Sequence, residues 1–199
     1  MGHSSRLPVT LDMTVRVFVT GGTFDKEYDE LSGTLFFRNT HVPEMLGRGR
    51  CGLDVDVETL MMVDSLEMTE AQRDAIVGAC RSCAEAQIVI THGTDTMVET
   101  ARAIALGVQG KTVVLTGAMV PYAFGSSDGL FNLGSALSFV QALPSGVYIA
   151  MNGRSFDWND VRKNRDAGVF ERVSASARER GSGVQSDRSS NGLDERMKR

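Results

Sequence analysis

Short apolar runs that end in glycine- and hydroxyl-rich turns alternate along this chain with segments of helical periodicity. Helical apolar spacing follows Thr69, which with Gln72 fits a capping box, and follows Thr96, which pairs in the same way with Glu99. A third helix is expected over residues 129–141. Strands that alternate with helices predict one α/β domain, a parallel sheet with helices on both faces in three αβα layers. The expected strands are residues 15–19, 53–63, 87–91, 112–115 and 147–151.

The turns that follow these strands are the polar part of the predicted domain. In a parallel sheet covered on both faces, ligands bind outside the carboxyl ends of the strands. That rule selects the turns at residues 21–23, 64–65, 92–96 and 117–119, which are rich in Gly, Thr, Ser and Asp. The pattern of elements and the chemistry of the turns therefore indicate the same edge of the sheet as the functional site.

Charge and composition set the limits of the folded unit. Of 21 Lys and Arg and 25 Asp and Glu, seven and four lie in residues 172–199, a net charge of plus three; residues 1–171 thus carry a net charge of minus seven. The Ser-, Gly- and Arg-rich segment 172–199 has too little apolar surface to offset the entropy of ordering and is predicted to be a disordered tail. We expect an N-terminal extension at 1–14 and one folded domain at 15–171.

Several classes of partner lack support in the sequence. No basic excess favours nucleic acid, and no polybasic block favours a membrane surface. No apolar run is long enough to span a bilayer and no signal segment is seen, so a cytoplasmic protein is expected. Three cysteines, an odd number, are interpreted as free thiols, and neither they nor the histidines show metal-ligand spacing. No metal and no cofactor are expected, since GxGxxG and GxxxxGK[ST] are absent.

The turns permit two kinds of chemistry. The TGGT turn at 20–23 could cradle a phosphate, although Gly-Gly turns are common. Alternatively Thr23 or Thr94 is a nucleophile, with backbone N–H groups around Gly22 and Gly93 stabilising an oxyanion. His92 is a possible base, but a hydrogen-bonded core histidine is favoured. Lys163 becomes a base if burial lowers its pKa, whereas composition alone favours a solvated lysine.

Two ordered motifs carry a resemblance to a known family. TGGT at 20–23 and HGTDT at 92–96, each after a predicted strand, resemble the signature motifs of the bacterial L-asparaginase family. The resemblance covers about residues 15–165. The chain is similar to the short-chain members of the family, which contain little more than the catalytic domain. Further segments resemble the family in the same order: DSLEMT at 64–69, TGAM at 116–119, SDGLFNL at 127–133 and DVRK at 160–163.

The resemblance implies a role for each matching residue. Thr23 is implied as the nucleophile that attacks the side-chain amide of asparagine. Thr94 and Lys163 are implied as a proton-relaying pair, and Asp95 as the ligand of the substrate ammonium. Ser65 is implied as the ligand of the α-carboxylate. An amino acid substrate requires such an anion for its ammonium and hydroxyl or N–H groups for its carboxylate.

The resemblance also implies a mobile lid with a catalytic tyrosine after the nucleophile, here the polar loop 24–33 with Tyr28. Leu66 stands where many relatives have a polar residue, which implies one hydrogen bond fewer to substrate. The expected function is hydrolysis of L-asparagine through a threonine-linked acyl-enzyme in a homo-oligomer, a dimer or tetramer. The alternatives are a glutaminase, an ammonia-supplying amidotransferase subunit, or a non-catalytic amino acid-binding domain. We expect no counterpart of the family's second domain and, in consequence, a weaker site.

Overall fold

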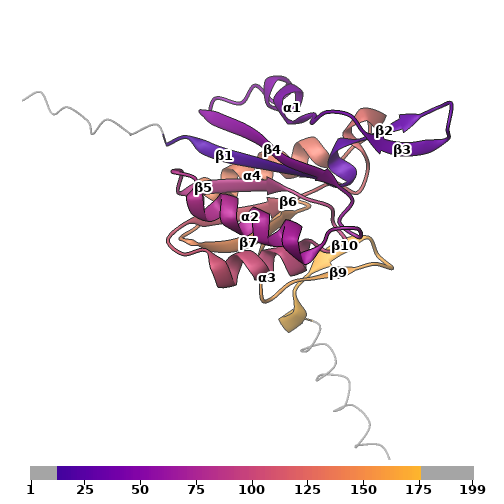
Figure 1. Ribbon diagram of the computed structural model, residues 1–199. Helices are drawn as coiled ribbons and strands as arrows, with labels where there is room; N and C mark the ends of the chain where they lie inside the picture. The colour runs from indigo at the N-terminus through magenta and orange to yellow at the C-terminus, as the bar shows by residue number, and fades with distance from the viewer. Residues whose placement is uncertain (1–12, 176–199) are drawn as a thin grey trace, which may run out of the picture.

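The computed structural model describes residues 13–175 as one α/β unit (Figure 1). The helices are α1 (Val42–Arg48), α2 (Glu70–Ser82), α3 (Met97–Gly107) and α4 (Gly129–Ala142), with short 3-10 turns at Thr23–Asp25 and Tyr122–Phe124. The strands are β1 (Val15–Gly21), β2 (Lys26–Asp29), β3 (Thr34–Phe37), β4 (Val55–Val63), β5 (Gln87–Thr91), β6 (Thr112–Thr116), β7 (Gly146–Met151), β8 (Arg154–Asp157), β9 (Arg162–Asn164) and β10 (Val169–Glu171).

The central sheet has the strand order β4-β1-β5-β6-β7-β8, and its first five strands are parallel. This confirms the predicted fold class. The edge strand β8 runs antiparallel to β7 and was not expected. Asn152 (φ 54°) and Gly153 (φ 75°) join the two strands in a two-residue turn, because Met151 pairs directly with Arg154. An Asn-Gly pair with both φ angles positive is a strong hairpin signal.

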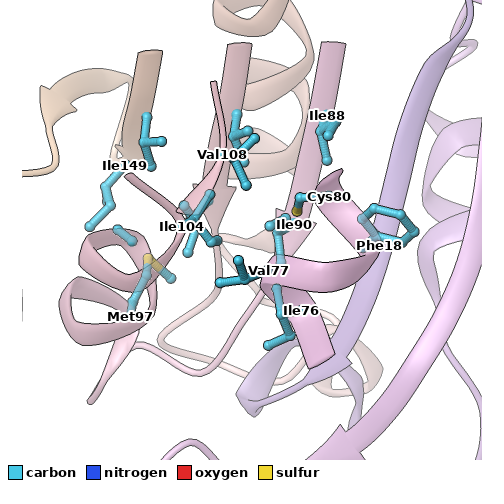
Figure 2. Packing of buried hydrophobic residues seen from close by; sticks show 14 of the residues in the cluster. Phe18, Ile76, Val77, Cys80, Ile88, Ile90, Met97, Ile104, Val108 and Ile149 are labelled. Atoms are coloured by element: carbon cyan, nitrogen blue, oxygen red, sulfur yellow. The ribbon is translucent and has the colours of Figure 1, made fainter. Parts of the chain in front are cut away.

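Alternate side chains of the strands supply two separate cores, one on each face of the sheet. Val15, Val17 and Val19 of β1 pack in the core that contains α1 and α4. Phe18 points to the other face, where it packs with Ile88 and Ile90 of β5 and with residues of α2 and α3 (Figure 2). Burial on both faces makes the strands nearly continuous apolar runs, and it confirms the three predicted layers.

The two predicted capping boxes differ in outcome. The Thr69 hydroxyl accepts a hydrogen bond from the Gln72 backbone N–H, and the Gln72 side chain accepts one from the Thr69 N–H, so the first box is confirmed. The second prediction is wrong, since Thr96 forms no side-chain cap on α3. Its hydroxyl instead donates to the backbone carbonyl of Ser65, at 2.8 Å. A tertiary acceptor therefore competes successfully with the local one.

Two small antiparallel hairpins, β2–β3 and β9–β10, and the short helix α1 were not expected from the sequence. In Figure 1 both hairpins lie at the right-hand edge of the sheet, beyond the end of β1. At the start of the predicted tail, the Ser174 backbone N–H and the Arg172 side chain bind Asp160. The rest of the predicted tail, from residue 176, and most of the predicted N-terminal extension lie outside the described residues.

Candidate active site

Three strand-end loops meet where β4, β1 and β5 lie side by side. Gly22 has a φ of 80°, and a Cβ placed on it would lie 2.3 Å from the backbone N of Gly93. A Cβ on Gly93 would in turn lie 2.5 Å from the Ser65 hydroxyl oxygen. Only glycine permits this approach, which brings the predicted nucleophile turn, the second motif and the predicted carboxylate ligand into one cluster.

Thr23 begins the 3-10 turn that follows β1, and its side chain is half-buried. Phe24 and Asp25, the next two residues, are fully buried and anchor the turn. Asp25 accepts hydrogen bonds from the backbone N–H of His41 at 2.8 Å and from the Thr40 hydroxyl at 3.0 Å. Within residues 13–175 the Thr23 hydroxyl makes no hydrogen bond, so it is free to engage a ligand. Its backbone is held in place by the two buried residues that follow it.

Lys163 reaches the site from the β9–β10 hairpin. Its register partner Phe170 is buried in the core, and this fixes the hairpin against the sheet. The Lys163 ammonium donates to the Thr94 hydroxyl at 2.8 Å and to the Asp95 carboxylate at 2.9 Å. Only 12% of the Lys163 side chain is exposed, so composition was a poor guide when it favoured a solvated lysine. The predicted cluster of Thr94, Asp95 and Lys163 is thus assembled from residues almost 70 positions apart.

The backbone donors at this edge are unequal. The Gly22 N–H donates to the Val63 carbonyl at 3.1 Å, so this particular N–H is already engaged, and oxyanion donors around Gly22 stay a prediction. The Gly93 N–H makes no hydrogen bond within the part of the chain that the structure describes. Gly93 therefore stays a candidate oxyanion donor, while Gly22 is needed for the close approach of two loops.

Ser65 lies almost fully buried at the end of β4, beside Gly93. Its loop is shaped by Asp64, whose Oδ1 accepts from the Leu66 backbone N–H at 3.0 Å. The same carboxylate forms an ion pair with Lys26, which lies on the strand that follows the nucleophile turn. Sequence reasoning missed Lys26 and Asp64 as site residues; opposite charges next to two motif residues were the only available signal.

His92 is a core histidine, as favoured from the sequence. Its Nδ1 donates to the Gly93 carbonyl at 2.7 Å, and its Nε2 accepts from the Thr100 hydroxyl at 2.8 Å. Because the carbonyl is only an acceptor, Nδ1 carries the proton, and in the neutral imidazole Nε2 is then the acceptor. Burial lowers the pKa of His92 to about 4. With both nitrogens occupied, His92 supports the HGTDT turn and cannot act as a base for Thr23.

Tyr28 lies on the β2–β3 hairpin, so the prediction of a loop over residues 24–33 is wrong. The strands pair Tyr28 with Leu35, and 56% of Tyr28 is exposed. Within residues 13–175 its hydroxyl makes no hydrogen bond, and the structure does not bring that hydroxyl into the Thr94–Lys163 cluster. Leu66 is also exposed.

Four further features of the described residues are a cavity away from the site, the metal-ligating side chains, the length of the helices and the cysteines. A cavity of about 640 Å³ lies between α1 and α4, lined by Met45, Leu53, Phe131 and Leu137 among others, and it contains no predicted site residue. The described residues hold no cluster of three metal-ligating side chains, and none of their helices is long and apolar enough to cross a membrane. The three cysteines are free thiols, and burial raises the pKa of Cys80 to about 12.

Comparisons with known proteins identify the family of this chain. The family model described as "Asparaginase, N-terminal" matches residues 14–179. An L-asparaginase of Thermococcus kodakarensis is 32% identical over 165 residues, which cover 79% of this chain and 49% of that protein. A glutamyl-tRNA(Gln) amidotransferase subunit from Methanococcus vannielii is 31% identical over 175 residues, covering 82% of this chain and 39% of the relative.

Solved structures give the same result. The thermostable L-asparaginase from Thermococcus kodakarensis superposes with a TM-score of 0.72 at 27% identity, over 81% of this chain and 51% of that one. A probable cytoplasmic L-asparaginase from Campylobacter jejuni gives a TM-score of 0.71 at 28% identity, over 80% and 53% of the two chains. The chain thus spans about half the length of these relatives, or less.

Proposed function

Because this chain belongs to the asparaginase family, we propose that it hydrolyses L-asparagine to L-aspartate and ammonia through an ester on Thr23. The observation that carries the proposal is the contact of Lys163 with both Thr94 and Asp95. It places a cation, a hydroxyl and a carboxylate at the strand edge where Thr23 and Ser65 also lie. That set matches the ammonium, carboxylate and amide groups of an amino acid amide.

The reaction proceeds in two half-reactions. The Thr23 oxygen attacks the side-chain amide carbon, and the Gly93 N–H stabilises the resulting oxyanion. The C–N bond breaks, and the nitrogen takes up the proton that the Thr23 hydroxyl gave up on attack, so that it leaves as ammonia. Water then attacks the ester carbon, and the Thr23 hydroxyl is restored as aspartate forms. The Thr94 hydroxyl relays protons with Lys163; in the arrangement observed the ammonium donates to Thr94, so relay to Lys163 requires the neutral amine.

The α-ammonium and the α-carboxylate of the substrate are bound by different residues. The Asp95 carboxylate, which is one-third exposed, accepts hydrogen bonds from the substrate ammonium. The Ser65 hydroxyl donates to the α-carboxylate. Tyr28 approaches the substrate only if the β2–β3 hairpin closes over Thr23, since 56% of the residue is exposed in this structure.

The remaining features of the proposal concern the whole molecule. We infer a cytoplasmic homo-oligomer, a dimer or tetramer, with a small-molecule substrate and with neither a nucleic-acid nor a membrane partner. The excess of acidic over basic residues in 1–171 disfavours a tRNA partner.

The second candidate function is glutamine hydrolysis, alone or as an ammonia-supplying subunit. It is favoured by the similarity to the Methanococcus amidotransferase protein, which is close to the similarity to the Thermococcus L-asparaginase. One methylene separates the two substrates, and a pocket discriminates one methylene by roughly 10–200-fold. Release of ammonia from glutamine in preference to asparagine would favour this function.

The test measures ammonia release from asparagine and from glutamine by the wild type, Thr23→Ala and Lys163→Met. Thr59→Ala, the same substitution at an exposed position of β4, is the matched control. We expect activity in the wild type and in Thr59→Ala, and a loss of at least roughly 10³-fold in the other two variants. Absence of ammonia from both substrates in the wild type contradicts the function, and full activity of Thr23→Ala contradicts the assignment of the nucleophile.

A further inference from the structure

An ion pair with no role in the proposed chemistry joins strand β2 to the loop that follows β4. The Lys26 ammonium binds Oδ2 of Asp64, and the side chains are 17% and 29% exposed. The Lys26 ammonium also lies 5.9 Å from the centre of the Phe37 ring, which limits its freedom. Burial alone would raise the pKa of Asp64, but the hydrogen bonds from Lys26 and from the Leu66 N–H lower it. The carboxylate is therefore charged at neutral pH and the pair is intact.

Each partner is coupled to a residue that acts on a different end of the substrate. The backbone N–H of Lys26 donates to the carbonyl of Thr23, so the strand position of Lys26 is tied to that of the nucleophile. Asp64 directly precedes Ser65, and its side chain and backbone carbonyl accept from Leu66 and Glu67. A shift of either partner would move the turn to which it is bonded.

We propose that the Lys26–Asp64 pair sets the separation between the Thr23 hydroxyl and the carboxylate subsite at Ser65, and thereby selects the length of the substrate. Asparagine and glutamine differ by one methylene between the α-carbon and the amide. A fixed separation between nucleophile and carboxylate subsite aligns only one of them for attack, because misplacement by about 1 Å is costly to reaction. Lys26 and Asp64 are positioning residues here, and the inference rests on the proposed function.

The test compares kcat/KM for asparagine with kcat/KM for glutamine in Lys26→Met and in Asp64→Asn. Arg48→Met is the matched control, since it also removes a cation from an ion pair, with Glu44 on α1, but at an exposed position away from these loops. We expect the preference between the two substrates to fall at least tenfold in both variants and to stay unchanged in Arg48→Met. Lys26→Arg should keep most of the preference. Asp64→Asn, which is nearly isosteric, provides the test if Lys26→Met fails to fold.

The double variant tests whether the two residues act through one contact. If they do, Lys26→Met combined with Asp64→Asn lowers the preference no further than either change alone. Equal loss of kcat/KM for both substrates overturns the inference, because it describes a general structural or proton-transfer role. An unchanged preference overturns it as well. If the wild type hydrolyses neither substrate, the proposed function fails and this inference fails with it.

Discussion

The buried, neutral state of His92 predicts how the stability of the fold depends on pH. An exposed histidine in the unfolded chain has a pKa of about 6.5, whereas burial lowers the pKa of His92 to about 4. Between these two values the unfolded chain binds a proton and the folded chain does not. The free energy of unfolding therefore falls as the pH falls from 6.5 towards 4, and this loss is absent above pH 7.

The size of the effect follows from the same two values. Proton binding to the unfolded chain removes about 2 kcal/mol of stability by pH 5 and about 3 kcal/mol by pH 4, relative to pH 7. His92→Gln removes the titratable group. It also disturbs the hydrogen bonds to Gly93 and Thr100, which costs about 1–3 kcal/mol at pH 7. At pH 7 the variant should be the less stable protein, and by pH 4 its disadvantage should have shrunk by about 3 kcal/mol.

Urea unfolding followed by circular dichroism, at pH 7, 6, 5 and 4 for both proteins, measures this difference. Other titrating groups are common to the two proteins, so their contributions cancel in the comparison. A difference in unfolding free energy that stays constant from pH 7 to pH 4 would refute the reasoning. It would mean that His92 titrates with the same pKa in the folded and unfolded chains.

Two further predictions concern the nucleophile turn. Gly22→Ala should destabilise the fold by about 2 kcal/mol more than Gly110→Ala. Both glycines have positive φ, but a Cβ on Gly22 would meet the backbone of Gly93, whereas a Cβ on Gly110 would have open space. Thermal unfolding compares the two variants, and equal losses of stability would contradict the predicted clash. Burial raises the pKa of Asp25, despite hydrogen bonds from neighbouring groups, so its charged form costs stability as the pH rises above 3.8. Asp25→Asn should therefore gain in unfolding free energy relative to the wild type between pH 4 and neutrality, and a relative loss over that range would contradict the buried carboxylate's part in the pH dependence.

Local sequence signals predicted the central elements well. The strand predicted at residues 87–91 matches β5, and the helix predicted at 129–141 matches α4 to within one residue. Their apolar patterns are strong because both elements are buried against the sheet. The β2–β3 hairpin was missed because β2 is polar, and the apolar run of β3 is only three residues long and partly exposed, too short to indicate a strand. The short α1, with seven residues, is below the length at which periodicity is informative.

Thr96 and Lys163 show how tertiary contacts overrode local reasoning. The Thr96 side chain had a local partner available in α3, yet it binds the Ser65 carbonyl. Lys163 lies in a segment whose composition is typical of solvated chain, yet its ammonium lies in the site because Phe170, its partner across the hairpin, is buried. In both cases the deciding partner lies more than 30 residues away along the chain or across a hairpin, where no local pattern records it.

By itself, the sequence determined the layers of the fold and the edge of the sheet where chemistry is possible. Apolar periodicity reports burial, and the carboxyl ends of parallel strands necessarily share one edge. Only the tertiary structure decided which groups meet at that edge: the Lys163 ammonium with Thr94 and Asp95, the Lys26 ammonium with Asp64, and Gly93 against Gly22. These contacts depend on strand order and hairpin register, which set distances that the spacing of motifs along the chain does not contain.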